Sequence, residues 1–167
     1  MNEQDEIIRA RLKLLDNYMV ELRRLQPTEF EEYVRNYLIH RTVERDLQTA
    51  IEACLDIGRH LIAREGFRYP EDNADVFRIL AEEQVIPPSL LAHLEDMAGF
   101  RNVLVHEYAD LDNHKVYRNF KDQLGDFDEF ASAIVAYLNR PVIDEGKTAH
   151  ERRAKYTARR KRKLART

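Results

Sequence analysis

The chain has 167 residues, of which 44% are hydrophobic and 34% are charged, a composition that fits one globular domain and excludes disorder throughout. Five Gly and five Pro are too few for the many turns of a sandwich or barrel, so the composition favours long helices. The one cysteine, Cys54, excludes an intrachain disulfide and a cysteine-based zinc site and suits a reducing compartment. No apolar run approaches the length of a membrane span and the first segment is acidic, so we expect a cytoplasmic protein without membrane contact.

Two helices are predicted in the first part of the sequence. The first covers residues 3–25, ends before Pro27, and repeats its apolar residues at steps of three and four. These residues are Ile8, Leu12, Leu15, Met19 and Leu22. Thr28 and Glu31 have the spacing of a capping box, which predicts that a second, long helix begins there and continues to about Arg64. Its apolar positions are Phe30, Val34, Tyr37, Leu38, Val43, Leu47, Ala50, Cys54, Ile57 and Leu61.

Three further helices follow a turn-rich segment at residues 66–73. A short helix is expected over residues 74–84, and Pro87 and Pro88 separate it from a helix over residues 89–107. Asp112 or Asn113 can cap the last helix, which runs to about residue 139 and can bend at Gly125. The sequence therefore predicts an all-α fold: an up-and-down bundle of four main helices plus one short helix, in residues 1–140.

Charge divides the chain into two parts. Residues 151–167 hold nine Lys or Arg and one Glu, a net charge of +8, whereas residues 1–150 hold 18 basic and 29 acidic residues, a net charge of −11. Residues 141–167 are therefore predicted to form a linker and a basic C-terminal tail. Such a block of charge either binds a polyanion or remains a solvated extension.

The helix predicted over residues 89–107 carries a cation on its apolar side. Leu94, Arg101 and Tyr108 are spaced seven residues apart and so fall in one row of the helix. An unpaired guanidinium on that side would cost several kcal/mol to desolvate, so Arg101 needs a partner. The partner can be a carboxylate of another helix or the phosphate of a ligand.

His106 lies about 140° around an ideal helix from Arg101, so one chain alone builds an incomplete Arg and His site. Asn102 precedes His106 by four residues, and its amide can hydrogen-bond the ring and select one tautomer. A two-fold partner that presents the same helix across a groove would bring two Arg and two His into one cleft. That combination suits phosphodiester chemistry, because imidazole moves protons near neutral pH and guanidinium stabilises charge on phosphate oxygens.

Residues 101–108, RNVLVHEY, match the Arg-x4-His-x-Tyr motif of the HepT toxins, and residues 1–140 resemble that all-helical HEPN family. Four further features add to the resemblance. They are the Asn directly after the Arg, the Tyr two residues after the His, the place of the motif near the end of the penultimate long helix, and the ERDL segment at residues 44–47. It implies the toxin of a type VII-like HepT/MntA toxin–antitoxin system, a homodimeric, metal-independent endoribonuclease that acts on RNA, with tRNA as the first candidate. In such an enzyme His106 would promote attack of the RNA 2′-hydroxyl on the adjacent phosphate, Arg101 would stabilise the transition state, and Asn102 would support both.

The resemblance also implies a partner, an MNT nucleotidyltransferase antitoxin that transfers AMP from ATP to Tyr108 and so silences the toxin. Tyr108 lies two turns from Arg101 and about 20° around the helix, so O-AMP-tyrosine would add negative charge beside the site that must hold RNA phosphate. The sequence has no Gly-rich phosphate loop, so we expect ATP to belong to the partner and no cofactor to be bound by this chain.

The remaining histidines show no metal-ligand spacing and are interpreted as structural or solvent-facing, so no metal site is expected. They are His40, His60, His93, His114 and His150. A non-catalytic alternative stays open, in which the same helical domain is an adaptor or binds a nucleotide or RNA without cutting it.

Overall fold

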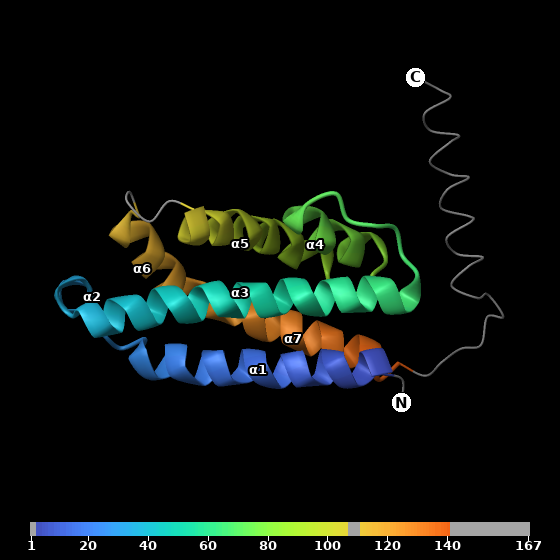
Figure 1. The fold of residues 1–167 in the computed structure, drawn as a ribbon, viewed down its shortest axis with the longest axis horizontal. Helices are drawn as coiled ribbons and strands as arrows, with labels where there is room; N and C mark the ends of the chain where they lie inside the picture. Colours follow the sequence, from blue (N-terminus) through green and yellow to red (C-terminus); the bar gives the residue numbers. More distant parts are fainter. Residues whose placement is uncertain (1–2, 107–110, 141–167) are drawn as a thin grey trace, which may run out of the picture.

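The structure, a computed structural model, describes residues 3–106 and 111–140, and within these ranges the chain forms seven helices and no strand. The helices are α1 (Glu3–Leu25), α2 (Phe30–Arg35), α3 (Tyr37–Glu65), α4 (Asn73–Glu82), α5 (Pro88–His106), α6 (Asn113–Asp122) and α7 (Leu124–Leu138). They pack as an elongated up-and-down bundle (Figure 1), which confirms the predicted all-α fold.

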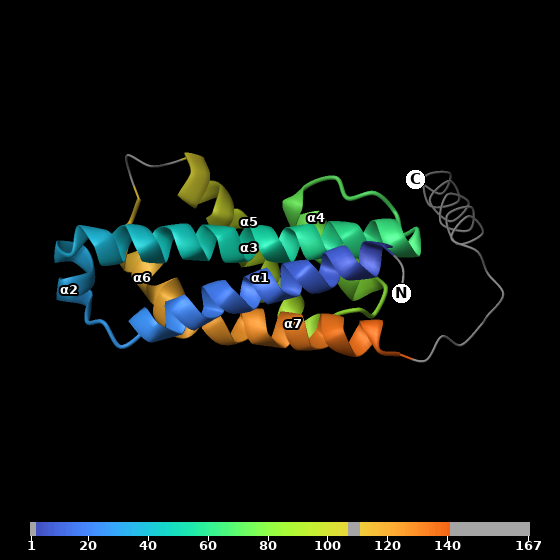
Figure 2. The ribbon, with the colours of Figure 1, turned by 60° about the horizontal axis from the view of Figure 1, so that its bottom comes forward.

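The longest helix, α3, is the centre of the bundle, because it contacts each of the other six described helices. In Figure 1, α1 lies along one side of α3, and α4 and α5 lie along the other. The last helix, α7, packs against both α1 and α5 and closes the bundle (Figure 2). α5 also contacts α3, and a hydrogen bond from Arg101 of α5 to Glu52 of α3 places Arg101 beside the central helix.

The apolar stripes predicted for α1 and α3 form the core. Buried positions on these two helices include Ile8, Leu15, Met19, Leu22, Val43, Leu47, Ala50, Cys54, Ile57 and Leu61. Each larger aliphatic side chain buried in this way contributes roughly 1.5–3 kcal/mol to folding. A close approach of α3 and α4 depends on Gly58, since a Cβ atom there would lie 2.5 Å from Cγ1 of Val76.

The long second helix of the prediction is divided at Asn36. This residue has an extended backbone (φ −91°, ψ 95°), and its side chain accepts a hydrogen bond from the Ile39 amide at 3.3 Å, which caps α3. Asn favours this role because its short side chain replaces a backbone partner at a helix start. The predicted capping box is wrong: Glu29 is the N-cap of α2, and it makes no capping hydrogen bond through its side chain.

The break at Asn36 changes which apolar residues are buried. Tyr37 and Leu38 begin α3 and are 77% and 75% exposed, so the prediction that they continue the core stripe is wrong. Tyr33 on α2 is instead fully buried.

The last predicted helix is also divided, at Gln123 and not at Gly125. Asp112 caps α6 by accepting hydrogen bonds from the amides of His114 and Lys115, which selects the first of the two predicted caps. Gln123 then separates α6 from α7 with a bridge-region backbone (φ −111°, ψ 7°). The turn lets α6 contact α3 and α2 while α7 contacts α1.

Several predictions lie outside the described residues. They are the end of the fourth predicted helix at Glu107, the modification site Tyr108, the linker and basic tail at residues 141–167, and His150. Among the helices that are described, none combines the length and apolar character that a membrane crossing requires.

Candidate active site

The predicted Arg-x4-His pair lies on the last turns of α5. Leu94, Ala98 and Leu104 are buried on the side of α5 that faces the core, and they fix the rotation of the helix. Arg101 is consequently half-buried at the seam between α5 and α3, with 25% of its side chain exposed. His106 is the final residue of α5 and is exposed.

Arg101 is paired with Glu52 of α3. Its Nη2 and Nε atoms donate to the same carboxylate oxygen, Oε1, at 3.1 and 3.3 Å. Gln48 Nε2 donates to that oxygen as well, at 3.1 Å. The prediction that Arg101 requires a partner is confirmed, and within one chain the partner is a carboxylate of another helix.

The pair is open to water, because 35% of the Glu52 side chain is exposed beside the 25% of Arg101. A guanidinium carries five N–H donors, and this one directs only Nε and Nη2 to the carboxylate. Its Nη1 atom is 3.5 Å from the Asn102 side-chain oxygen, which is a long contact. Arg101 is therefore oriented by α3 and still has donors that a phosphate can accept from.

Asn102 has a different partner from the one predicted. Its amide oxygen approaches Arg101, whereas no hydrogen bond to His106 is present in residues 3–106 and 111–140. Asn102 is exposed, and the contact with the guanidinium shows that its side chain points toward Arg101. The predicted selection of a His106 tautomer by Asn102 is wrong for the single chain.

The structure does not bring Arg101 and His106 together in one chain. Arg101 faces α3, while the His106 ring is exposed and makes no hydrogen bond or ion pair with any residue of the described ranges. Within the described residues of one chain, the two side chains therefore share no contact.

A small pocket of about 40 Å³ lies next to the site, between α3 and the end of α5. It is lined by Arg41, Glu44, Arg45, Gln48 and Leu104. Glu44 is buried, and its carboxylate contacts the Arg41 guanidinium at 2.9 Å and His40 Nε2 at 2.7 Å. Burial, together with the nearby Glu44 carboxylate, raises the pKa of the Tyr33 hydroxyl above its ordinary value.

Sequence reasoning missed this group of α3 residues as functional candidates. A signal was present, since Arg41, Arg45, Gln48 and Glu52 follow steps of four, three and four and share one helix face. That face borders the core stripe, which places polar side chains at a helix–helix seam.

The other histidines described by the structure have local partners. His40 pairs with Glu44, His60 with Gln4, and His93 with Asp126, while the His114 ring stacks on Phe30. Asp126 raises the pKa of His93 by accepting a hydrogen bond from its ring. In residues 3–106 and 111–140, no group of three His, Cys, Asp or Glu side chains could hold a metal ion.

Comparison with known proteins gives consistent matches. The family model described as Ribonuclease HepT-like matches residues 15–134. A tRNA nuclease HepT of Aphanizomenon flos-aquae is 28% identical over 137 residues, covering 82% of this chain and 93% of the relative. An mRNA nuclease HepT of Shewanella oneidensis is 30% identical over 105 residues, covering 63% of this chain and 79% of the relative.

Among solved structures, a tri-AMPylated HEPN toxin of Shewanella oneidensis in complex with its MNT antitoxin superposes with a TM-score of 0.72. It is 26% identical in sequence, and the match covers 81% of this chain and 99% of that one. The family match spans well over half of the chain and includes α3 and the Arg101–His106 segment of α5. The chain belongs to the HepT-like ribonuclease family.

Proposed function

We propose that this protein is the toxin of a type VII-like HepT/MntA toxin–antitoxin system and cleaves RNA without a metal ion. The site is composite: Arg101 of one subunit and His106 of the other meet at a homodimer interface. The observation that carries the proposal is the geometry of α5, where Arg101 is held at the seam with α3 and His106 stands exposed five residues on. Neither group is complete alone, and a two-fold copy supplies the missing half.

The chemistry follows from the two side chains. His106 accepts the proton of a ribose 2′-hydroxyl, whose oxygen attacks the adjacent phosphorus to form a 2′,3′-cyclic phosphate. The bond to the 5′-oxygen breaks, and this oxygen takes a proton from water and leaves as a 5′-hydroxyl. Arg101 donates to the phosphate oxygens on which charge develops, and Asn102 supports it through its contact with the guanidinium. Glu52 and Gln48 keep Arg101 in place before the substrate arrives.

The substrate is proposed to be RNA in the cytoplasm, with tRNA as the first candidate. Support comes from the relatives, one of which is named a tRNA nuclease and another an mRNA nuclease. Both names agree with a site that holds a phosphodiester and a neighbouring 2′-hydroxyl. Total RNA, which contains both classes, is therefore the appropriate first substrate.

The primary experiment incubates the full chain with total RNA in EDTA. Cleavage is expected to proceed and to fall by about a hundredfold or more in His106→Ala and in Arg101→Ala, because each variant loses one part of the transition-state stabilisation. His93→Ala is the matched control, since it removes a 60% exposed histidine from the same helix and should leave cleavage unchanged. Cleavage that survives both site variants, or that EDTA abolishes, contradicts the proposal.

The partner is proposed to be an MNT nucleotidyltransferase that silences the toxin by AMPylation of Tyr108. The related toxin from Shewanella oneidensis is tri-AMPylated and in complex with such an antitoxin. Tyr108 follows His106 by two residues, so an attached phosphate would compete with RNA phosphate for Arg101. Incubation with the antitoxin and ATP should add the mass of one or more AMP units, and Tyr108→Phe should prevent the addition. Equal modification of Tyr108→Phe contradicts the choice of residue.

A second candidate function is a helical adaptor or binding module that holds a nucleotide or RNA without cutting it. The observation that favours it is the Arg101–Glu52 pair, because a guanidinium that is already paired within one chain is the arrangement of a structural ion pair. Under this alternative, RNA binds and stays intact in the experiment above. Intact RNA with the unmodified protein selects this candidate.

A further inference from the structure

One face of α3 carries a line of polar and aromatic side chains that leads to Arg101. We call it the α3 stripe: Tyr37, Arg41, Arg45, Gln48 and Glu52. These residues are four, four, three and four positions apart, so they fall within an arc of about 80° on an ideal helix. The stripe ends at Glu52, which holds Arg101.

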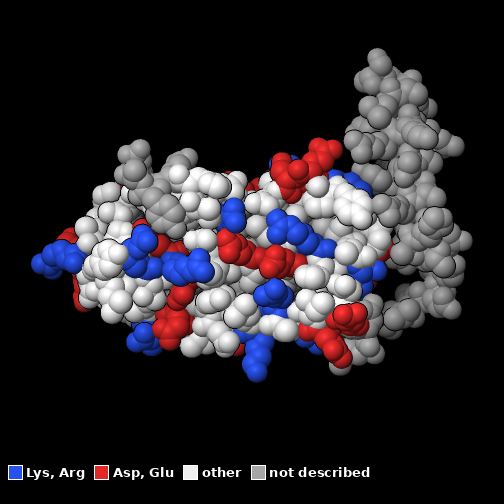
Figure 3. Space-filling view, in the orientation of Figure 1, with Lys and Arg blue, Asp and Glu red and all other residues white. Residues whose placement is uncertain are grey.

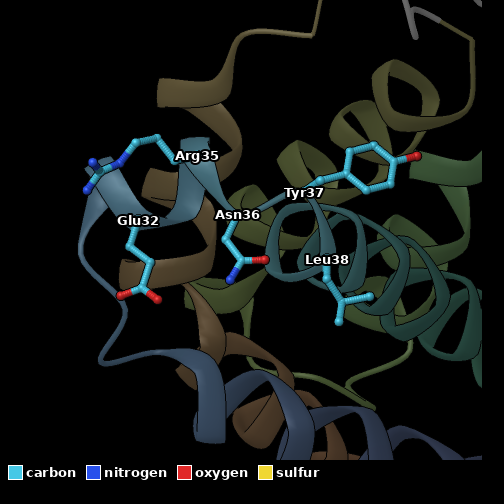
Figure 4. Close-up of a pocket in the computed structure, with 5 residues that line it drawn as sticks. All are labelled: Glu32, Arg35, Asn36, Tyr37 and Leu38. Atoms are coloured by element: carbon cyan, nitrogen blue, oxygen red, sulfur yellow. The ribbon is translucent and has the colours of Figure 1, made fainter.

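The start of the stripe is an exposed aromatic ring. Tyr37 is 77% exposed at the first turn of α3, beside a hollow that it lines with Glu32, Arg35, Asn36 and Leu38. Figure 4 shows the ring directed away from the helix and away from Leu38. With 77% of its surface exposed, the ring is accessible to a planar ligand.

The middle of the stripe is cationic. Arg41 and Arg45 line the pocket against Leu104 of α5. Arg41 shares the Glu44 carboxylate with His40, whereas Arg45 is exposed and has no hydrogen bond or ion pair through its side chain in the described residues. Figure 3 shows Lys and Arg side chains along α3, over its N-terminal half as well as its C-terminal half, with Asp and Glu side chains beside them. The pocket therefore offers guanidinium donors beside the proposed site.

We propose that the α3 stripe binds a single-stranded segment of the RNA substrate and directs it to Arg101 and His106. The Tyr37 ring stacks on a base, and Arg45, aided by Arg41, binds backbone phosphates. A stacking aromatic in line with guanidinium groups is the arrangement by which proteins hold single-stranded nucleic acid without reading its sequence. This inference rests on the proposed function, because it names the surface through which that site receives its substrate.

The test measures binding separately from cleavage. The probe is a fluorescein-labelled 2′-O-methyl oligouridylate, which lacks the attacking hydroxyl, and fluorescence anisotropy reports its Kd for the otherwise wild-type full chain. Tyr37→Ala combined with Arg45→Gln is expected to raise Kd about tenfold or more. Loss of the Arg45 contact should also reduce the slope of log Kd against log salt by about 0.7, the value for one phosphate on a single strand.

Matched variants control for non-specific effects. Tyr69→Ala removes a tyrosine that is 74% exposed, and Arg59→Gln removes an arginine from the far end of α3, so both should leave Kd unchanged. Tyr37→Phe keeps the stacking face and should bind like the wild type. Duplex RNA of the same length should be insensitive to Tyr37→Ala, because its bases are already stacked.

An unchanged Kd in the double variant overturns the inference. The inference is also overturned if the double variant binds RNA normally but no longer forms the homodimer or the antitoxin complex, as measured by light scattering. The stripe would then be a protein interface. The failure of the proposed function has a different signature, namely cleavage that is independent of His106. With that result, the anisotropy measurement would still report whether the α3 stripe binds RNA.

Discussion

Arg68 and Arg101 are both paired with carboxylates, and their surroundings differ. Arg68, which precedes α4, meets Asp75 and Glu82: Nη2 is 2.6 Å from Asp75 Oδ1, Nη1 contacts Oδ2, and Nε and Nη2 each lie 3.1 Å from a Glu82 oxygen. Arg101, near the end of α5, directs two nitrogens to a single oxygen of Glu52.

The difference distinguishes a structural ion pair from an arginine that can still donate to a phosphate. Only 14% of the Arg68 side chain and 8% of the Asp75 side chain are exposed, and the Asp75 carboxylate also accepts from the Glu71 amide. Four of the five N–H donors of the Arg68 guanidinium are engaged by these two carboxylates. Arg101 and Glu52 are more exposed, and donors on Arg101 remain. An arginine that is oriented but not saturated is what phosphate binding requires.

The largest expected effect on folding comes from Arg68→Ala. This change leaves the Asp75 carboxylate buried without its main partner, and we expect it to lower the free energy of unfolding by about 3 kcal/mol. Urea denaturation measures it, with Arg24→Ala, whose side chain is 68% exposed, as a control that should cost less than about 1 kcal/mol. If Arg68→Ala lowered the free energy of unfolding as little as the control does, the contrast between Arg68 and Arg101 would be removed.

A smaller effect should appear on acidification. The hydrogen bond from Arg68, assisted by the Glu71 amide, lowers the pKa of Asp75 below its ordinary value. A carboxyl whose folded pKa is depressed stabilises the fold above its unfolded pKa of about 3.9 and loses that contribution as the pH falls through the folded pKa. Unfolding free energy should therefore decline below about pH 4, and less steeply in Asp75→Asn. Equal slopes in the two proteins would show that Asp75 is not the group responsible.

The smallest effect is expected for Glu52→Gln. Because the Arg101–Glu52 pair is partly exposed, its loss should change the free energy of unfolding by less than about 1 kcal/mol. The same urea experiment measures this change. A cost as large as that of Arg68→Ala would mean that Arg101 is a structural residue and would favour the adaptor function.

Much of the fold could be predicted because apolar periodicity reports the buried face of a helix. The predicted bounds of α1 agree with Glu3–Leu25, and the stripe from Val43 to Leu61 is buried. The breaks at Asn36 and Gln123 could not be predicted by periodicity, since an apolar pattern can continue across an interruption. At Asn36 the local side-chain cap outweighs continuation of the helix, and Tyr37 and Leu38 become exposed.

The site was predictable to a similar degree. The position of Arg101 on the apolar side of its helix implied a partner, but the identity of Glu52 depends on how α3 and α5 pack, which no local pattern specifies. Asn102 had two neighbours within reach, and the structure directs it to Arg101. The pocket near Leu104 is built from two helices, so neither segment indicates it alone.

The central claim is that Arg101 of one subunit works with His106 of another. It is tested most directly with a heterodimer of Arg101→Ala and His106→Ala chains, which are co-expressed with different affinity tags and purified through both. Each homodimer should be inactive, whereas the heterodimer retains one intact Arg101 and His106 pair and should recover about half of the wild-type cleavage rate. A heterodimer as inactive as its parents, or a chain that cleaves RNA as a monomer, would contradict the account.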